Sequence, residues 1–209
     1  MIAVVDYGAG NIHSVARALT KVGATFEITA HPDEITGAEA IILPGVGAAA
    51  DTMRGLQGAR VDDPVVTAIA RGTPYLGICM GLQILFDESE EDGGTPCLGI
   101  LPGTVIRFPT DLDVPHMGWN QVHQKTPTPL MQGVAQDANF YFIHSYFASP
   151  AIDAHVIATT DYGFPFTSAV QRDNLFATQF HPEKSGEIGL QIYANFVRIV
   201  GQTPLPDFC

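Results

Sequence analysis

The sequence has few charged residues and very few basic ones. Charged residues make up 15% of its 209 residues, and 10 Lys or Arg stand against 22 Asp or Glu, a formal net charge of −12. Nucleic acids and anionic membrane surfaces are bound by Lys and Arg that neutralise phosphates. The shortage of basic residues therefore argues against a nucleic-acid or membrane partner.

Cysteines and long hydrophobic runs are also scarce. Cys79, Cys97 and Cys209 form neither a CxxC pair nor a zinc-ligand spacing, and no H-E-x-x-H occurs, so no metal or other cofactor is expected. Without a disulfide framework, a reducing cytoplasm is the predicted compartment. The N-terminal residues lack the basic segment of a signal peptide. Pro or Gly interrupts the most apolar stretches, such as Ile41–Leu43, before they could span a bilayer.

The first half of the chain alternates short apolar runs with helical patterns. The expected strands are Ile2–Val5, Thr25–Ile28, Ala40–Leu43 and Tyr75–Ile78, and the expected helices are Asn11–Val22, Ala48–Leu56, Pro64–Ala70 and Cys79–Phe86. This β-α-β alternation predicts a parallel sheet with helices on both faces.

The second half contains closely spaced, hairpin-like strands. They are expected at Thr104–Phe108, Trp119–Gln124, Phe140–Phe147, His155–Thr160, Thr167–Gln171 and Leu175–Phe180, before a final amphipathic helix at Gly186–Val200. The predicted fold class is α/β, a single domain over residues 1–209. Its central sheet is expected to be mixed and mostly parallel, flanked by helices, with antiparallel strands in the second half.

The strongest local signal is a G-x-C-x-G pattern, Gly77–Gly81, between an apolar strand and a helical pattern. It is the sulfur counterpart of the G-x-S-x-G nucleophile elbow, in which glycines permit a sharp strand-to-helix turn. A following helix N-terminus favours the thiolate of Cys79, and the Met80 amide would lie where an oxyanion develops. The alternative is a buried structural cysteine.

A thiol nucleophile needs a base, and the base needs an orienting group. Among seven histidines, His181 ends an apolar strand and is followed by Glu183, with Pro182 stiffening the segment between them. Cys79 and His181 would meet at the carboxyl edge of the sheet, where α/β folds place their sites. The alternative is a surface histidine whose neighbouring glutamate is only a favourable first-turn charge.

The segment Pro44-Gly45-Val46-Gly47 follows the predicted strand Ala40–Leu43. Its glycines would let the backbone approach a ligand and present amide donors. A plain tight turn is the alternative for this segment alone.

Together, Gly77–Gln83 and Gln179–Ser185 resemble the triad (class I) glutamine amidotransferases, and the resemblance covers the whole chain. The segments that are similar to the branch of this family serving histidine biosynthesis are Asp6–Asn11, Pro44–Gly47, Pro115–Asn120 and Tyr141–Phe147. Other class I members usually carry Gly at the position of Val46.

The resemblance implies that Cys79 attacks the side-chain carboxamide of L-glutamine and forms a glutamyl thioester. It implies that His181, oriented by Glu183, protonates the departing ammonia and then activates water. The implied glutamine-binding positions are Gly47, Gln83, Glu91 and the backbone around Ser145 and Tyr146, and the expected oxyanion donors are the amides of Val46 and Met80.

Because the predicted domain takes up all 209 residues, we expect no second domain within them that could consume ammonia. The resemblance implies a heterodimer in which ammonia is channelled to a (β/α)8-barrel cyclase subunit, with Asn11, Tyr141 and Lys184 at or near the interface. Because a β-branched residue resists positive φ, Val46 suggests regulation. We hypothesise that the oxyanion hole is misformed in the isolated subunit and is completed when the partner holds its substrate.

Three alternatives stay open on the sequence. The first is a glutaminase for another synthase, such as those making anthranilate or pyridoxal phosphate, which would differ only in its partner. The second is a cysteine hydrolase or peptidase, which would work without a partner. The third is a thiol-bearing binding or sensor module, in which a glutamine-derived electrophile would fail to label Cys79.

Overall fold

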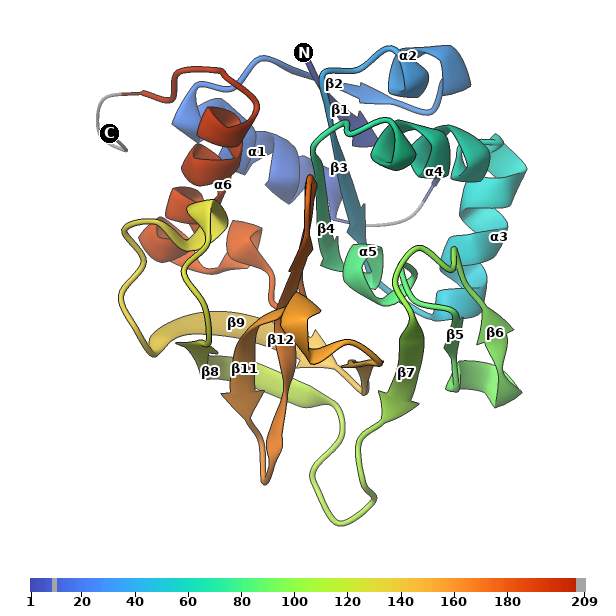
Figure 1. The fold of residues 1–209 in the computed structure, drawn as a ribbon, viewed down its shortest axis with the longest axis vertical. Helices are drawn as coiled ribbons and strands as arrows, with labels where there is room; N and C mark the ends of the chain where they lie inside the picture. The colour runs from blue at the N-terminus through green and yellow to red at the C-terminus, as the bar shows by residue number, and fades with distance from the viewer. Residues whose placement is uncertain (9–10, 206–209) are drawn as a thin grey trace.

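The computed structural model describes residues 1–8 and 11–205. Within them, the strands form a nine-stranded sheet in the order β2-β1-β3-β4-β13-β12-β11-β8-β9 and a four-stranded sheet in the order β10-β7-β5-β6. Figure 1 shows the fold as a ribbon. The strands are β1 (Ile2–Val5), β2 (Phe26–Thr29), β3 (Ala40–Gly45), β4 (Tyr75–Cys79), β5 (Glu88–Ser89), β6 (Thr95–Pro96), β7 (Gly103–Arg107), β8 (His116–Gln124), β9 (Ala138–His144), β10 (Tyr146–Pro150), β11 (Val156–Asp161), β12 (Pro165–Arg172) and β13 (Leu175–Thr178).

The helices cover the parallel part of the larger sheet on both faces. They are α1 (Ile12–Val22), α2 (Pro32–Thr36), α3 (Ala49–Ala59), α4 (Asp62–Ala70), α5 (Met80–Gln83) and α6 (Gly186–Ile199), and the short 3-10 turns are η1 (Glu91–Gly93), η2 (Pro129–Met131), η3 (Asp153–His155) and η4 (Pro182–Lys184). One apolar cluster joins α1 and α6 to one side of the sheet. A second cluster joins α2, α3 and α4 to the other side.

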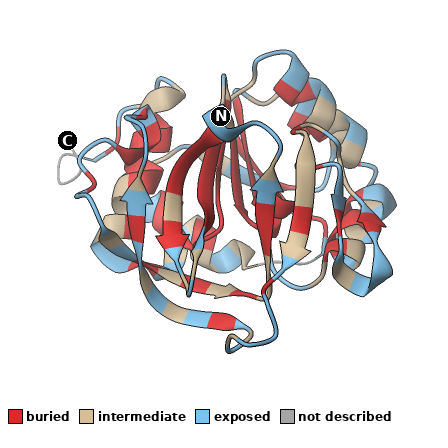
Figure 2. Ribbon diagram, turned by 60° about the horizontal axis from the view of Figure 1, so that its bottom comes forward, coloured by how far each residue is buried: buried red, intermediate tan, exposed pale blue. Residues whose placement is uncertain are grey.

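Burial on both faces explains the uninterrupted apolar runs of the central strands. Every residue of β1, β3 and β4 is buried, and Figure 2 shows these strands almost wholly in the buried colour. A strand that is covered on both sides has no solvent face, so its sequence does not alternate. The strands predicted from these runs in the first half are confirmed within one or two residues.

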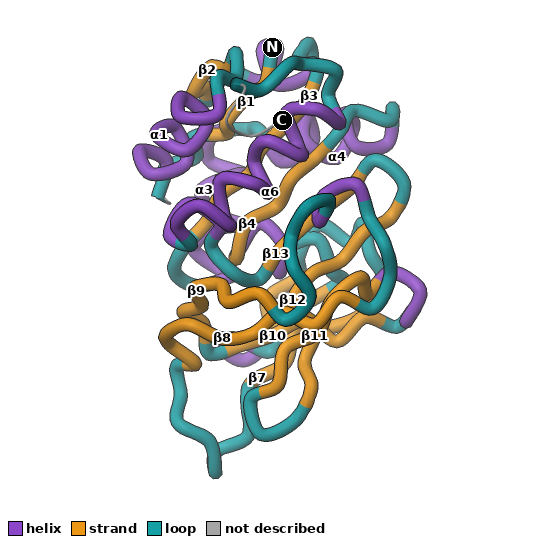
Figure 3. Tube along the Cα trace, turned by 90° about the vertical axis from the view of Figure 1, so that its left-hand side faces the viewer, coloured by secondary structure: helices purple, strands orange, loops and turns teal. Residues whose placement is uncertain are grey.

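The predicted mixed α/β sheet is confirmed, with parallel and antiparallel parts of equal weight. Strands β2, β1, β3, β4 and β13 pair in parallel, and β13, β12, β11, β8 and β9 pair antiparallel. In the larger sheet four of the eight pairings are parallel, which is half rather than most, because the second half of the chain returns through hairpins. In the side view of Figure 3 the helices gather at one end and strands β7 to β12 at the other.

The structure corrects the expected strand Phe140–Phe147. The chain leaves the larger sheet after β9, passes through Ser145, and enters the smaller sheet as β10. The run is rich in aromatic residues on both sides of Ser145, so composition alone does not mark the change of sheet. Ser145 and Tyr146 therefore lie at a junction between the two sheets.

Other differences concern short elements. The helix expected at Cys79–Phe86 is only α5, and α2, β5 and β6 carry too few residues to show a periodic pattern. Of the segments singled out in the sequence, Ala9 and Gly10 and the tail residues 206–209, with Cys209, lie outside the described residues. No helix in the described part is long and apolar enough to cross a membrane.

Candidate active site

Cys79 ends strand β4 in a strained turn. Its φ of 55° and ψ of −102° lie in a region that a non-glycine residue rarely adopts. The flanking glycines explain how the turn closes. A Cβ on Gly77 would lie 2.3 Å from the Gly81 carbonyl oxygen, and a Cβ on Gly81 would lie 2.0 Å from the Leu43 carbonyl oxygen. The predicted sharp strand-to-helix turn is therefore present, and no larger residue fits at either glycine.

We expect Gly81→Ala to destabilise the protein by about 3 kcal/mol or more, because the new methyl group would overlap backbone of β3 that has no room to move. Gly58→Ala is the matched control. Gly58 lies exposed in α3 with open space around it, and there the same substitution should stabilise by about 0.4–1 kcal/mol. Urea unfolding of both variants measures the contrast, and equal effects would contradict this account of the turn.

His181 reaches the same edge of the sheet from β13, the parallel neighbour of β4. Its backbone amide donates to the Tyr141 carbonyl of β9 at 2.9 Å, and the Ser185 hydroxyl donates to its carbonyl at 2.7 Å. The imidazole Nδ1 lies 2.7 Å from Glu183 Oε1, and both side chains are 1% exposed. The predicted pairing of His181 with Glu183 is thus a buried, rigidly anchored contact.

The electrostatics of His181 favour its protonated form. Burial lowers its pKa, but an ionised Cys79 and the Glu183 carboxylate outweigh that effect and raise the pKa to about 10. The second ring nitrogen, Nε2, is buried without a hydrogen-bond partner in the described structure, which leaves it available to the thiol. An imidazolium beside a sulfur nucleophile can serve as a general acid toward a leaving amine.

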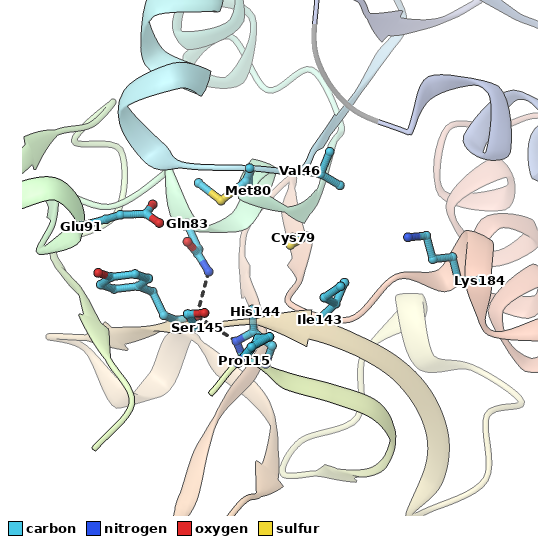
Figure 4. Close-up of a pocket in the computed structure, with 12 residues that line it drawn as sticks. Val46, Cys79, Met80, Gln83, Glu91, Pro115, Ile143, His144, Ser145 and Lys184 are labelled. Atoms are coloured by element: carbon cyan, nitrogen blue, oxygen red, sulfur yellow. Dashed lines mark hydrogen bonds between the residues drawn. The ribbon is translucent and has the colours of Figure 1, made fainter. Parts of the chain in front are cut away.

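A cavity of about 370 Å³ opens in front of Cys79 (Figure 4). Its lining residues are Val46, Gly47, Cys79, Met80, Gln83, Glu91, Pro115, Ile143, His144, Ser145, Tyr146 and Lys184. It holds every residue expected to bind glutamine or an oxyanion. His181 and Glu183 are buried and do not line it, and neither do Asn11 and Tyr141. Lys184, expected at an interface, lies at the cavity and over the Tyr141 ring at 5.7 Å.

The turn after β3 packs tightly against the elbow. A Cβ on Gly45 would lie 2.6 Å from both Met80 Cβ and the Tyr7 hydroxyl oxygen. Gly47 takes a φ of +100°, whereas Val46 keeps a negative φ, as expected of a β-branched residue. The backbone that precedes Val46 is therefore held next to Cys79, with which Gly45 pairs across the two strands.

Gln83 and Glu91 supply polar atoms to the cavity wall. Gln83 Nε2 donates to the Tyr146 carbonyl at 2.8 Å and to Gln179 Oε1 at 3.0 Å. Glu91 Oε2 accepts from the Ala49 amide at 2.7 Å, and burial raises the pKa of Glu91 above its usual value despite that hydrogen bond. Glu91 is thus the member of the acidic run 87–92 that faces the cavity.

Sequence reasoning assigned no role to Gln179, His116 or His144. Gln179 is fully buried, and its Nε2 lies 3.6 Å from Cys79 Sγ. His116 and His144 are 28 residues apart in the sequence. Nothing in the sequence signals that β8 and β9 bring them together. Among the described residues, no group of three or more His, Cys, Asp and Glu side chains could hold a metal ion.

A cysteine in a strained strand-to-helix turn, a buried His–Glu pair and an adjoining cavity are the arrangement expected of a cysteine-dependent enzyme of the α/β class. Residues 3–200 match the family Glutamine amidotransferase class-I. The chain belongs to the class-I glutamine amidotransferase family.

Curated relatives narrow the position of the chain within this family. It is 53% identical over 199 residues to "Imidazole glycerol phosphate synthase subunit HisH" of Dehalococcoides mccartyi, an alignment that covers 95% of this chain and 97% of the relative. Proteins of the same name from Acinetobacter baylyi and Methanothermobacter thermautotrophicus are 51% and 49% identical, covering 94% and 96% of this chain and 97% and 99% of theirs.

Solved structures agree on the fold. "Structure of PurLQS from Thermotoga maritima" superposes with a TM-score of 0.76 at 20% identity, covering 95% of this chain and 98% of that one. "Crystal structure of glutamine amidotransferase" gives a TM-score of 0.75 at 20% identity, with 96% and 100% covered.

Proposed function

We propose that this chain is the glutaminase subunit of an imidazole glycerol phosphate synthase in histidine biosynthesis. It hydrolyses L-glutamine and passes the ammonia to a cyclase subunit, which makes imidazole glycerol phosphate and aminoimidazole carboxamide ribotide. The observation that carries the catalytic part is that Cys79, which lines the cavity, interacts with His181 of the buried His181–Glu183 pair. The relatives' shared name supports the choice of synthase.

In the proposed reaction the Cys79 thiolate attacks the carboxamide carbon of glutamine. The amides of Val46 and Met80 hold the oxyanion of the tetrahedral intermediate. His181 gives its proton to the leaving nitrogen, so that ammonia departs and a glutamyl thioester remains. His181 then takes a proton from water, the hydroxide attacks the thioester, and glutamate leaves with regeneration of the thiolate. Glu183 keeps the imidazole oriented and stabilises its charge.

The substrate's amino-acid end is proposed to bind at the opposite side of the cavity from Cys79. The Gln83 oxygen and the Glu91 carboxylate would accept hydrogen bonds from the α-ammonium group. Gly47 and the backbone around Ser145 and Tyr146 complete the glutamine subsite.

The proposed cyclase contact lies on the exposed side of β8 and β9. Met117 and Trp119 are 63% and 58% exposed, which is unusual for large apolar side chains. The Trp119 ring lies 6.3 Å from the Tyr141 ring, over which Lys184 is placed. Tyr141, Lys184 and Asn11 are the proposed interface residues of the heterodimer, with the cytoplasm as its compartment. Channelling through this face would keep ammonia unprotonated.

The test is glutamate release from glutamine by the chain alone, then with a (β/α)8-barrel cyclase subunit of the histidine pathway and its nucleotide ligand. The proposal expects low activity alone and a large stimulation in the complex. Strong activity that the cyclase does not change would point to another partner or to a free-standing hydrolase. Activity in neither case, with no labelling of Cys79 by a glutamine-derived electrophile, would support a binding module instead.

A further inference from the structure

Two buried histidines lie side by side behind the glutamine cavity. His116 of β8 and His144 of β9 are 3% and 6% exposed, and their strands pair these two residues directly. His116 Nδ1 lies 3.0 Å from His144 Nε2. Only His144 reaches the cavity wall. Neither residue has a role in the proposed reaction. Because buried polar groups are costly without hydrogen-bond partners, the donors and acceptors of the two rings must be matched.

The hydrogen bond of His144 to the Tyr146 carbonyl determines which ring nitrogens of the two histidines carry protons. His144 Nδ1 lies 2.8 Å from the Tyr146 carbonyl oxygen, which can only accept, so Nδ1 carries the proton. His144 Nε2 is then an acceptor, and His116 Nδ1 must donate to it. His116 Nε2 accepts in turn from Asn120 Nδ2 at 3.1 Å. The three hydrogen bonds that link Asn120, the two histidines and the Tyr146 carbonyl are therefore donated in the same direction, from Asn120 toward Tyr146.

The surroundings of His144 keep its ring neutral. The rings of Phe108, Phe142 and Phe166 lie within 5.2 to 5.7 Å of its centroid. Burial lowers the pKa of His144 to about 3 and that of His116 to about 4. The titratable groups facing the pair are His181, whose charge further lowers the pKa of His144, and Tyr162, whose ring lies 4.2 Å from that of His116.

The Tyr146 carbonyl is also where Gln83 is held. It accepts from His144 Nδ1 and from Gln83 Nε2 at the same time, as the dashed lines in Figure 4 show. Gln83 gives its other N–H to Gln179 Oε1, which turns Gln179 Nε2 toward Cys79 Sγ. Both donors of Gln83 are thereby used, and its oxygen remains without a partner in the described structure.

We propose that His144 and His116 are positioning residues that fix the Tyr146 carbonyl and, through it, the Gln83 amide, so that the Gln83 oxygen faces the α-ammonium group of glutamine. The assignment of the bound group rests on the proposed function. The hydrogen-bond order of the two rings does not, and it is tested separately.

Two variants of His144 test its two ring nitrogens, Nδ1 and Nε2, separately. In His144→Asn the amide nitrogen can take the place of Nδ1 and still donate to the Tyr146 carbonyl. In His144→Gln the longer amide reaches the place of Nε2 toward His116 and leaves the carbonyl without this donor. In the complex with the cyclase, His144→Gln should raise the KM for glutamine about tenfold or more. His144→Asn should stay within about threefold of the wild type, and kcat should change less than KM in both variants.

A KM that rises equally in both variants would overturn the role of the Tyr146 carbonyl. A loss confined to kcat would instead place His144 in the chemical step. Urea unfolding of both variants shows whether they remain folded under the assay conditions.

The second readout needs neither glutamine nor the partner. Nitrogen NMR of the wild-type chain should show both rings protonated at Nδ1 only, unchanged from pH 8 to pH 5. The unfolded chain protonates His144 near pH 6.5, so stability should fall as the pH falls below that value. Relative to pH 8, this residue alone should raise the unfolding equilibrium constant about 30-fold at pH 5. His144→Asn should lack this part of the pH dependence.

Protonation of either histidine ring of the folded protein above pH 5, or the opposite tautomer, would overturn the proposed hydrogen-bond order. That holds even if the chain proves to be a glutaminase. Correct tautomers without any glutaminase activity would overturn the proposed function and leave the hydrogen-bond order standing.

Discussion

Cys79→Ala should reduce glutamine-dependent turnover of the complex by at least about 10⁴-fold, because no other group can form the thioester. Synthesis driven by added ammonia should be unaffected, since that reaction bypasses this subunit's chemistry. Glutamate release and cyclase turnover, measured in parallel with glutamine and with ammonium salt, separate the two activities.

Cys97→Ala is the matched control for this prediction. Cys97 does not line the cavity, and burial raises the pKa of its thiol to about 11, which leaves it a poor nucleophile. This variant should keep full glutamine-dependent turnover, and a glutamine-derived electrophile should still label it at Cys79. Glutamate release by Cys79→Ala within tenfold of the wild type would rule out a thioester route.

Val46→Pro should lower the stimulated glutaminase rate by about 10²- to 10³-fold, because proline removes the amide proposed to bind the oxyanion. The backbone itself should tolerate the change, since Val46 already has a negative φ and the residue is 37% exposed. Initial rates of glutamate release with the cyclase and its ligand measure the loss.

Two further substitutions at this position test gating. Val46→Ala keeps the amide and should retain most of the stimulated rate. Val46→Gly removes the resistance to positive φ and should raise the rate of the chain alone, so that the partner's ligand stimulates it less. Full stimulated turnover in Val46→Pro would show that another donor binds the oxyanion.

The elbow could be predicted from the sequence because its cause is local. Gly77 and Gly81 are needed wherever a nucleophile stands in a turn this tight, and the apolar run before them marks a strand. The pairing of His181 with Glu183 is local as well, since the two residues are separated only by Pro182. Within such a short segment, residue type and spacing already determine which groups can meet.

The roles of His144 and Gln179 could not be predicted, because they depend on contacts between distant segments. His144 meets His116 through the register of β8 and β9, and it meets the Tyr146 carbonyl because the chain changes sheets at Ser145. A run that is rich in aromatic residues on both sides of Ser145 does not reveal such a change. The cavity wall is therefore a property of the two sheets together rather than of any one motif.

Strands β3, β4 and β13 are immediate neighbours in the larger sheet, and each delivers one part of the proposed chemistry from its carboxyl end. The Val46 turn, Cys79 and His181 are consequently spaced by the hydrogen-bond ladder of the sheet, about 4.8 Å from one strand to the next. Loops and surface residues elsewhere can accumulate changes without altering that spacing. A lineage could thus exchange the protein it docks with while inheriting the same reaction centre, and grafting a new docking face should leave the relative positions of these three parts unchanged.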